Sequence, residues 1–211
     1  MRKKAETRLI EGSVGNIEIR VKPSTEVEMA NSKKRLVVIS HPHSLYGGSM
    51  DNKVVTTMER AFSRLGYTTV AYNFRGVGRS QGEYDNGLGE QQDLQEVLNW
   101  ARDQFAIEYS VLAGFSFGSY VALKAQDVCK VDALCTVAPP VGLYDFSTVA
   151  EIELPWVLIQ GGEDEVVSAE EILDWAMSRE FKPDVYWRNQ ASHFFHGELI
   201  WLRKVIEASF S

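Results

Sequence analysis

The serine at position 116 stands in a pentapeptide whose residue types suit nucleophilic chemistry. Residues 114–118 read Gly-Phe-Ser-Phe-Gly, which fits the pattern G-x-S-x-G. An apolar run at 111–113 precedes the pattern and helical spacing follows at 117–127, so we expect a strand that turns directly into a helix. Such a turn strains its central residue and leaves no space for a Cβ two residues to either side. The pattern therefore predicts a Ser116 hydroxyl that projects above a helix N-terminus, where free N–H groups favour developing negative charge.

A serine nucleophile needs a base to take its proton, and the base needs a partner to fix its tautomer. The chain offers four histidines as candidate bases: His41, His43, His193 and His196. The partner should follow a strand, and Asp164 occupies the centre of such a loop at 161–167. Its neighbours Glu163 and Glu165 are expected to face solvent, and Asp145, in the loop after the previous strand, is the rival carboxylate.

The elements that must position these residues alternate between strand and helix. Runs at 7–11 and 17–21 predict an opening hairpin. The continuous apolar run at 36–39 is typical of a strand buried on both faces of a parallel sheet. Residues 52–65 then show helical spacing that ends at Gly66. The alternation continues with strands at 68–74, 111–113, 131–138, 156–159 and 185–187, and with helices at 88–105, 117–127, 168–178 and 197–209.

This alternation predicts an α/β fold of three layers: a mostly parallel, twisted sheet with helices on both faces and an antiparallel hairpin at the N-terminus. In such sheets ligands bind outside the carboxyl ends of the strands. The serine, the acidic loop and the histidines all follow predicted strands, so we expect them to meet at one edge of the sheet.

Composition limits the classes of function. The 211 residues, 45% of them hydrophobic, suit a single domain over 1–211. A net charge of −7 argues against a nucleic-acid partner, and the basic cluster at 33–35 is interpreted as a charged loop. No apolar run is long enough to span a membrane, and the basic start at 1–4 lacks the apolar stretch of a secretion signal. We therefore expect a cytoplasmic protein whose two cysteines, Cys129 and Cys135, stay reduced.

Taken together, these motifs resemble the α/β-hydrolase superfamily over nearly the whole chain. Residues 41–55 resemble the H-P-H-x-x-x-G-G-x-M-x-N-K-V-V loop of small bacterial-type hydrolases. Residues 73–80 resemble the D-x-R-G-x-G-x-S turn of the superfamily, with Asn73 in place of the usual Asp. That turn is structural in the family, so the departure is not expected to affect the chemistry. The spacing after Gly78 does not fit G-x-G-x-x-G, so we expect neither a dinucleotide nor another cofactor.

The resemblance implies a role for each candidate. Family members carry nucleophile, acid and histidine in that chain order, which implies Ser116, Asp164 and His193. His193 lies in a polar loop after the last predicted strand, whereas His196 precedes the final helix and is expected to be structural. The order excludes His41 and His43 as bases, and no third ligand stands near them in sequence, so no metal is expected.

The resemblance also implies an oxyanion hole and a substrate pocket. One backbone donor should be the N–H of Phe117. The second should come from the loop at 41–48, and because Pro42 has no N–H it is His43 or, alternatively, Ser44. Residues next to these positions are expected to line the pocket: Ser44, Leu45, Tyr46, Phe115, Tyr144 and Phe194.

Larger relatives carry a lid after the strand that here ends at Ala138. Only residues 141–154 separate Pro140 from Pro155, which is too few for a helical cap domain. We therefore expect an open site in which the loop at 141–146 forms one apolar rim.

The function favoured by the sequence is that of a serine hydrolase that cleaves a carboxylic ester or thioester through an acyl-enzyme on Ser116. The substrate would be a small molecule or an acyl group. A serine peptidase of the same fold uses the same residues, and a non-catalytic binding protein could retain the fold without the chemistry. The sequence leaves these alternatives open.

Overall fold

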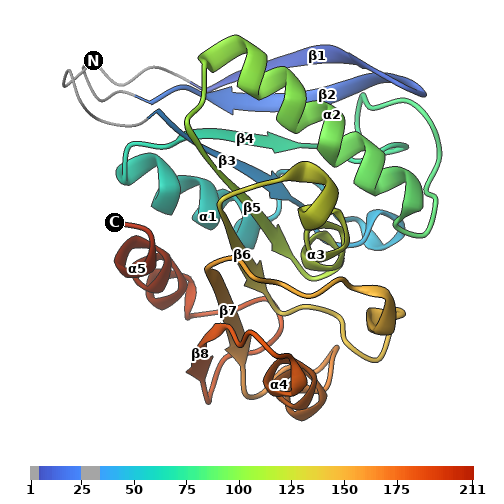
Figure 1. The fold of residues 1–211 in the computed structure, drawn as a ribbon. Helices are drawn as coiled ribbons and strands as arrows, with labels where there is room; N and C mark the ends of the chain where they lie inside the picture. The colour runs from blue at the N-terminus through green and yellow to red at the C-terminus, as the bar shows by residue number, and fades with distance from the viewer. Residues whose placement is uncertain (1–4, 25–33) are drawn as a thin grey trace.

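The computed structural model describes residues 5–24 and 34–211. The basic start at 1–4 and Lys33 of the predicted charged loop lie outside the described residues. Within them, eight strands form one sheet in the order β1-β2-β4-β3-β5-β6-β7-β8 (Figure 1). The strands are β1 (Glu6–Gly12), β2 (Gly15–Lys22), β3 (Arg35–Ser40), β4 (Thr68–Tyr72), β5 (Tyr109–Phe115), β6 (Ala133–Val137), β7 (Trp156–Gly161) and β8 (Asp184–Arg188).

The direction of the strands follows the sequence pattern. β1 and β2 form an antiparallel hairpin, and β2 also pairs antiparallel with β4. The neighbouring strands from β4 through β3 to β8 all pair in parallel. The central strands are continuous apolar runs because helices cover both of their faces. The predicted mostly parallel sheet with an N-terminal hairpin is confirmed.

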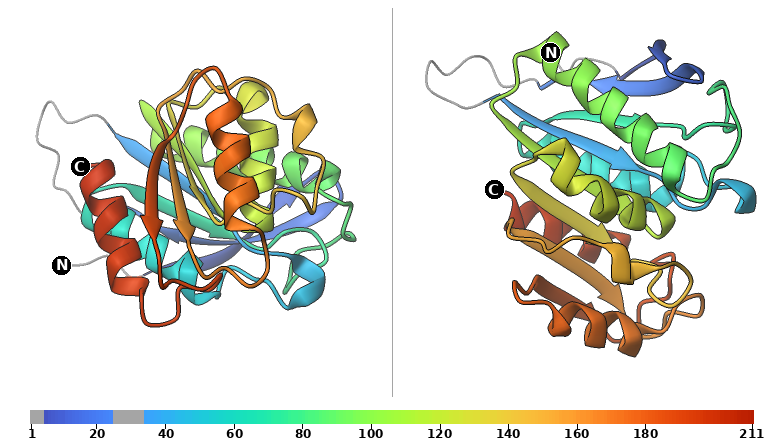
Figure 2. Two further views of the ribbon diagram at one scale, coloured as in Figure 1. Left: turned by 90° about the horizontal axis from the view of Figure 1, so that it is seen from below. Right: turned by 45° about the vertical axis from the view of Figure 1, so that its right-hand side comes forward.

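Five helices in the described ranges cover the sheet: α1 (Lys53–Arg64), α2 (Leu88–Phe105), α3 (Phe117–Cys129), α4 (Ala169–Ser178) and α5 (Leu199–Ser209). Figure 2 shows α1 and α5 on one face and the other three helices on the opposite face. Alternate residues of β3 feed the two cores, with Leu36 and Val38 toward α2 and α3, and Val37 and Ile39 toward α1 and α5. Period-two side-chain alternation thus gives one strand two buried faces.

Element boundaries differ from the predicted ones where polar contacts end a strand. The run predicted as a strand over 68–74 pairs only to Tyr72, because the N–H of Asn73 donates to the carbonyl of Glu18 at 2.9 Å and the chain then turns. The final helix begins at Leu199 rather than at Gly197, whose positive φ of 78° lies outside the helical region.

No lid is present in the described part of the chain. The segment between β6 and β7 contains one short 3₁₀ turn, η2 (Phe146–Thr148), and no helical cap, as the sequence predicted. Among the described helices, none combines the length and apolar character needed to cross a bilayer.

Candidate active site

Ser116 lies at the junction of β5 and α3, where the chain turns from strand into helix without a loop. Its φ of 53° and ψ of −121° are unusual for a residue with a side chain and cost about 1–3 kcal/mol. A Cβ on Gly114 would collide with the carbonyl of Gly118, and a Cβ on Gly118 with the carbonyl of Ser40. Both glycines are therefore required for β5, α3 and the end of β3 to approach this closely. The predicted strained turn is present.

The structure brings Ser116, His193 and Asp164 together across the carboxyl edge of the sheet. The Ser116 Oγ lies 3.0 Å from the His193 Nε2, and the His193 Nδ1 lies 2.8 Å from the Asp164 Oδ2. An ionised carboxylate only accepts hydrogen bonds, so the Nδ1 carries the proton and the Nε2 is free to accept one from the serine. This is the arrangement that a general base requires.

Asp164 is held as a charged acceptor although its side chain is buried. Burial alone would raise the pKa of Asp164, but hydrogen bonds from His193 and from the N–H groups of Val166 and Val167 lower it below its ordinary value. The rival carboxylate, Asp145, instead accepts a hydrogen bond from the N–H of Ser147 at the start of η2.

Gln160 contacts Asp164, and the sequence did not predict this contact. It is fully buried at the end of β7, and its Nε2 donates to the Asp164 Oδ2 at 3.0 Å. A single polar residue at the end of an otherwise apolar strand was the signal for it. The carboxylate of Glu165, expected only to face solvent, also accepts a hydrogen bond from the His193 N–H at 3.0 Å. Both contacts orient the acid and the histidine loop.

The first turn of α3 and the loop after β3 supply free backbone donors. Within the described residues, neither the N–H of Phe117 nor that of His43 or Ser44 donates to another protein group. The next N–H groups along the loop are occupied: that of Leu45 by the His43 Nδ1 and that of Tyr46 by the His43 carbonyl. Both residues that the sequence offers as the second oxyanion donor, His43 and Ser44, therefore have an N–H group without a described protein acceptor.

His41 joins the loop after β3 to the turn after β4. Its Nε2 accepts a hydrogen bond from the Phe74 N–H at 3.0 Å, and its Nδ1 donates to the Pro42 carbonyl at 2.6 Å. Burial is the main cause that lowers the pKa of His41 from 6.5 to about 4, so the ring is neutral at pH 7. Both ring nitrogens are engaged, and no cluster of side chains in the described ranges is arranged to hold a metal ion.

The neutral His41 predicts a loss of stability in acid. Between pH 6.5 and about 4 the His41 ring is protonated in the unfolded chain but not in the folded protein. Stability therefore falls as the pH drops through this window. At pH 4 the loss in free energy of unfolding amounts to about 3 kcal/mol. We expect His41→Gln, which cannot titrate, to lose correspondingly less free energy of unfolding between pH 7 and pH 4.5. Urea unfolding at both pH values tests this, with the exposed His196→Gln as control. Equal losses in wild type and His41→Gln would contradict it.

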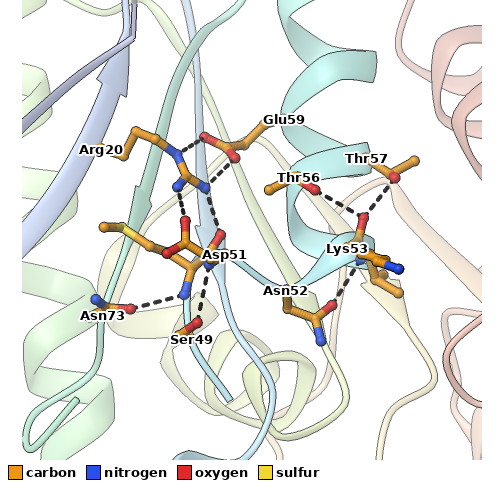
Figure 3. Close-up of polar contacts among 11 residues, drawn as sticks. Arg20, Ser49, Asp51, Asn52, Lys53, Thr56, Thr57, Glu59 and Asn73 are labelled. Atoms are coloured by element: carbon orange, nitrogen blue, oxygen red, sulfur yellow. Dashed lines mark hydrogen bonds and ion pairs between the residues drawn. The ribbon is translucent and has the colours of Figure 1, made fainter. Parts of the chain in front are cut away.

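Asn73, the residue that departs from the family pattern, ties three segments together. Its Oδ1 accepts from the Met50 N–H at 2.9 Å, the bond drawn from Asn73 in Figure 3. Its Nδ2 donates to the Glu18 Oε2 at 2.8 Å. Figure 3 also shows Arg20 bonded to Glu59 and to Asp51, and the same guanidinium donates to the Met50 carbonyl. Asn suits this position because one amide both donates and accepts, whereas Asp could only accept.

Restoring the family's usual residue is expected to destabilise this protein. Asn73→Asp would place a second carboxylate against Glu18 in a buried site and should cost about 3 kcal/mol at pH 7. Adding Glu18→Gln should recover part of the lost stability, because it removes the second carboxylate and its amide can donate to the introduced one. The recovery is partial, because the Arg79 N–H bonds to the same Glu18 Oε2 and loses that acceptor. Urea unfolding of the two single variants and the double variant measures this coupling. A double variant no more stable than Asn73→Asp would contradict it.

The predicted pocket residues fall into different environments. Tyr144 packs against His43 and Phe117, with ring centroids 6.4 Å and 5.4 Å away. Phe115 is fully buried 5.1 Å from the His193 ring, and Phe194 lies at the same distance from that ring.

The loop positions of the predicted pocket are less uniform. Leu45 and Tyr46 are 68% and 86% exposed, and the Tyr46 ring lies 4.7 Å from that of His43. The Ser44 hydroxyl is buried without a partner in the described structure. Phe146, predicted to be part of the rim, is instead a core residue that packs on Tyr120 and Trp175.

Tyr84 is a further residue beside the site that the sequence did not predict. Its ring lies 4.8 Å from that of His43, and its hydroxyl lies 3.3 Å from the hydroxyl of Tyr144. It comes from the long segment between β4 and α2, which carries no local pattern that would place it there.

Known proteins with related sequences share this fold. Residues 23–151 match the sequence profile of the family described as X-Pro dipeptidyl-peptidase (S15 family). Ser116 lies inside the matched region, whereas Asp164 and His193 lie outside it. The chain is also 34% identical over 194 residues to "Uncharacterized protein RP471" of Rickettsia prowazekii, a match that covers 87% of this chain and 79% of that protein.

Two solved structures are similar over almost the full length. XC6422 from Xanthomonas campestris, described as an α/β serine hydrolase without a lid, is 39% identical with a TM-score of 0.91, covering 99% of this chain and 94% of that one. An α/β serine hydrolase homologue from Coxiella burnetii is 40% identical with a TM-score of 0.91, covering 98% and 97%.

Proposed function

The chain belongs to the S15 family of α/β-hydrolases, and from this premise we propose that it is a serine hydrolase that cleaves a carboxylic ester or thioester. The observation that carries the proposal is the unbroken hydrogen-bond chain from the Ser116 Oγ through His193 to Asp164. Ser116 is the proposed nucleophile, His193 the base and Asp164 the group that orients the base.

The proposed reaction has two halves. The Ser116 Oγ attacks the carbonyl carbon while the His193 Nε2 takes its proton, and Asp164 stabilises the resulting imidazolium. The negative oxygen is held by the N–H of Phe117 and by that of His43 or Ser44. The intermediate then expels an alcohol or thiol, which receives the proton from His193. In the second half, His193 deprotonates a water that attacks the acyl-enzyme, which releases the acid and restores Ser116.

A fluorophosphonate probe tests this proposal directly, because it reacts with activated serines. We expect an adduct on Ser116, located by mass spectrometry, that is absent from Ser116→Ala and unchanged in the control Ser178→Ala at the far end of α4. A folded wild-type protein that stays unlabelled would favour a non-catalytic binding protein instead.

The family match favours a peptidase as the second candidate. The description of the family names an X-Pro dipeptidyl-peptidase, and a peptidase would use the same serine, histidine and aspartate. Rates on para-nitrophenyl esters and on glycyl-prolyl para-nitroanilide separate the two. Ester cleavage alone supports the esterase or thioesterase, and efficient release of the anilide supports the peptidase.

A reducing compartment suits this chain. Cys129 and Cys135 are both free and buried, and burial raises the pKa of Cys129 to about 11, so its thiol stays protonated and unreactive. Two cysteines that form no disulfide are typical of a reducing compartment, so we propose that the hydrolase acts in the cytoplasm.

A further inference from the structure

Two separate groups of aromatic rings flank Ser116. On one side, Phe115 and Phe194 pack against His193. On the other side lies what we call the His43 cluster: His43, Tyr84, Phe117 and Tyr144, whose ring centroids lie 4.8–6.4 Å apart in the contacting pairs. No ring contact joins the two groups in the described structure.

The chemistry of acyl transfer decides which part of a substrate each group meets. His193 must hand its proton to the leaving atom, so the leaving group lies on the side of the His193 Nε2. The acyl group extends away from that atom. This leaves the His43 cluster, which makes no ring contact with His193, as the ring group available to the acyl chain: its Phe117 directly follows Ser116, and the His43 ring packs 5.2 Å from that of Phe117.

The His43 ring presents a hydrogen-bond donor within this cluster. Its Nδ1 accepts from the Leu45 N–H at 3.2 Å, so a neutral ring carries its proton on Nε2. Burial lowers the pKa of His43 below its ordinary value, which keeps the ring neutral at pH 7. No described residue accepts a hydrogen bond from the Nε2–H.

The two tyrosines supply a second donor. Their hydroxyls lie 3.3 Å apart, so that one donates to the other and the remaining hydroxyl proton has no acceptor in the described protein. Both side chains are half-buried, which leaves the pair accessible. The cluster therefore combines apolar ring faces with two donors that lack protein acceptors.

The charges around the cluster disfavour an anionic ligand. The cation–π contacts of the described chain involve none of its rings. Glu90, which caps α2 beside Tyr84, brings negative charge close to both tyrosine hydroxyls. Resting on the proposed function, we infer that the His43 cluster is the acyl-binding subsite and selects acyl groups that carry a neutral oxygen acceptor, such as an ether, carbonyl or hydroxyl. His43 is then a specificity-determining residue through its side chain as well as a candidate oxyanion donor through its backbone.

Two esters with the same leaving group test this inference. Para-nitrophenyl pentanoate and para-nitrophenyl 3-methoxypropanoate differ by one methylene replaced with oxygen. We expect wild type to prefer the methoxy ester roughly 3- to 10-fold in kcat/KM, the worth of one hydrogen bond. Each rate is first divided by that ester's rate in alkali, which removes the difference in intrinsic reactivity. The ratio of the two rates is the readout, so a general loss of activity in a variant cancels.

Two variants of His43 separate the ring donor from the loop structure. His43→Phe keeps a ring but removes the donor. His43→Asn also removes the Nε2–H donor. Its amide oxygen can still accept from the Leu45 N–H, as that of Asn52 does from the Val54 N–H at 2.8 Å. We expect both variants to lose most of the preference for the methoxy ester, with the remainder due to the tyrosine pair. If His43→Asn and His43→Phe keep the wild-type preference, the inference is wrong.

The tyrosine pair requires a double variant, because either hydroxyl alone would keep a free proton. Tyr84→Phe/Tyr144→Phe should lower the preference for the methoxy ester, whereas the control Tyr109→Phe at the other end of β5 should not. Equal rates of wild type on both esters would contradict the inferred acyl-binding subsite. They would not affect the proposal that the protein is a serine hydrolase. Release of para-nitrophenol that does not depend on Ser116 would overturn the proposed function itself.

Discussion

Replacing Ser116 or His193 with alanine is expected to lower kcat by about 10⁶, and Asp164→Asn by about 10⁴. In the proposed mechanism Ser116 donates a proton that His193 receives across the 3.0 Å contact, so neither residue works without the other. The proposed role of Asp164 is limited to the orientation and charge of the imidazole, and an amide at that position would favour the wrong tautomer.

Steady-state kinetics on a para-nitrophenyl ester measure these losses. Because the residues act as one unit, Ser116→Ala/His193→Ala should be no slower than either single variant. His196→Ala is the matched control: this histidine lies three residues from His193 and is exposed, and its variant should retain wild-type kcat. A comparable loss in His196→Ala, or losses that add in the double variant, would contradict the assignment.

Replacing Arg75 with methionine is expected to destabilise the fold by about 3–5 kcal/mol, which corresponds to a fall in Tm of about 10 °C. Arg75 and Asp93 form a buried ion pair with side chains 6% and 1% exposed and an Nη2–Oδ1 distance of 2.8 Å. The Arg75 N–H donates to the same carboxylate at 2.9 Å. Removing the guanidinium leaves a buried carboxylate without its cation, which costs more than the pair itself contributes.

Replacing Asp93 as well tests whether the unpaired carboxylate causes the loss of stability. Arg75→Met/Asp93→Leu removes both charges and should recover much of the lost free energy of unfolding, measured by urea titration. The pair Arg203–Glu207 on α5 serves as control, since its side chains are more than 20% exposed and Arg203→Met should cost less than about 1 kcal/mol. A double variant as unstable as Arg75→Met would show that lost packing, and not the unpaired carboxylate, dominates.

The sequence by itself determined the features that depend on neighbours along the chain. The turn at Ser116 could be predicted because Gly114 and Gly118 flank the serine between an apolar run and a helical one. The parallel sheet followed from the alternation of those runs, and the missing lid from the length of one loop. Each of these depends on local sterics or on chain length, which a sequence displays directly.

Only the tertiary structure decided which side chains from distant segments meet. In the sequence Gln160 is only a polar residue at the end of a strand. The fold places its Nε2 3.0 Å from the Asp164 Oδ2. From the sequence, Asn73 in place of the family's Asp was not expected to matter. The tertiary structure shows that its amide accepts from the Met50 N–H and donates to Glu18.

The surroundings of His43 were decided in the same way. Tyr84 and Tyr144 come from segments 60 residues apart, and their hydroxyls meet only in the folded chain. Such contacts depend on the angles at which helices and loops leave the sheet, and those angles are set by packing of the whole core, which no local pattern records. The sequence therefore determined where the chemistry could occur, and the tertiary structure decided which groups surround it.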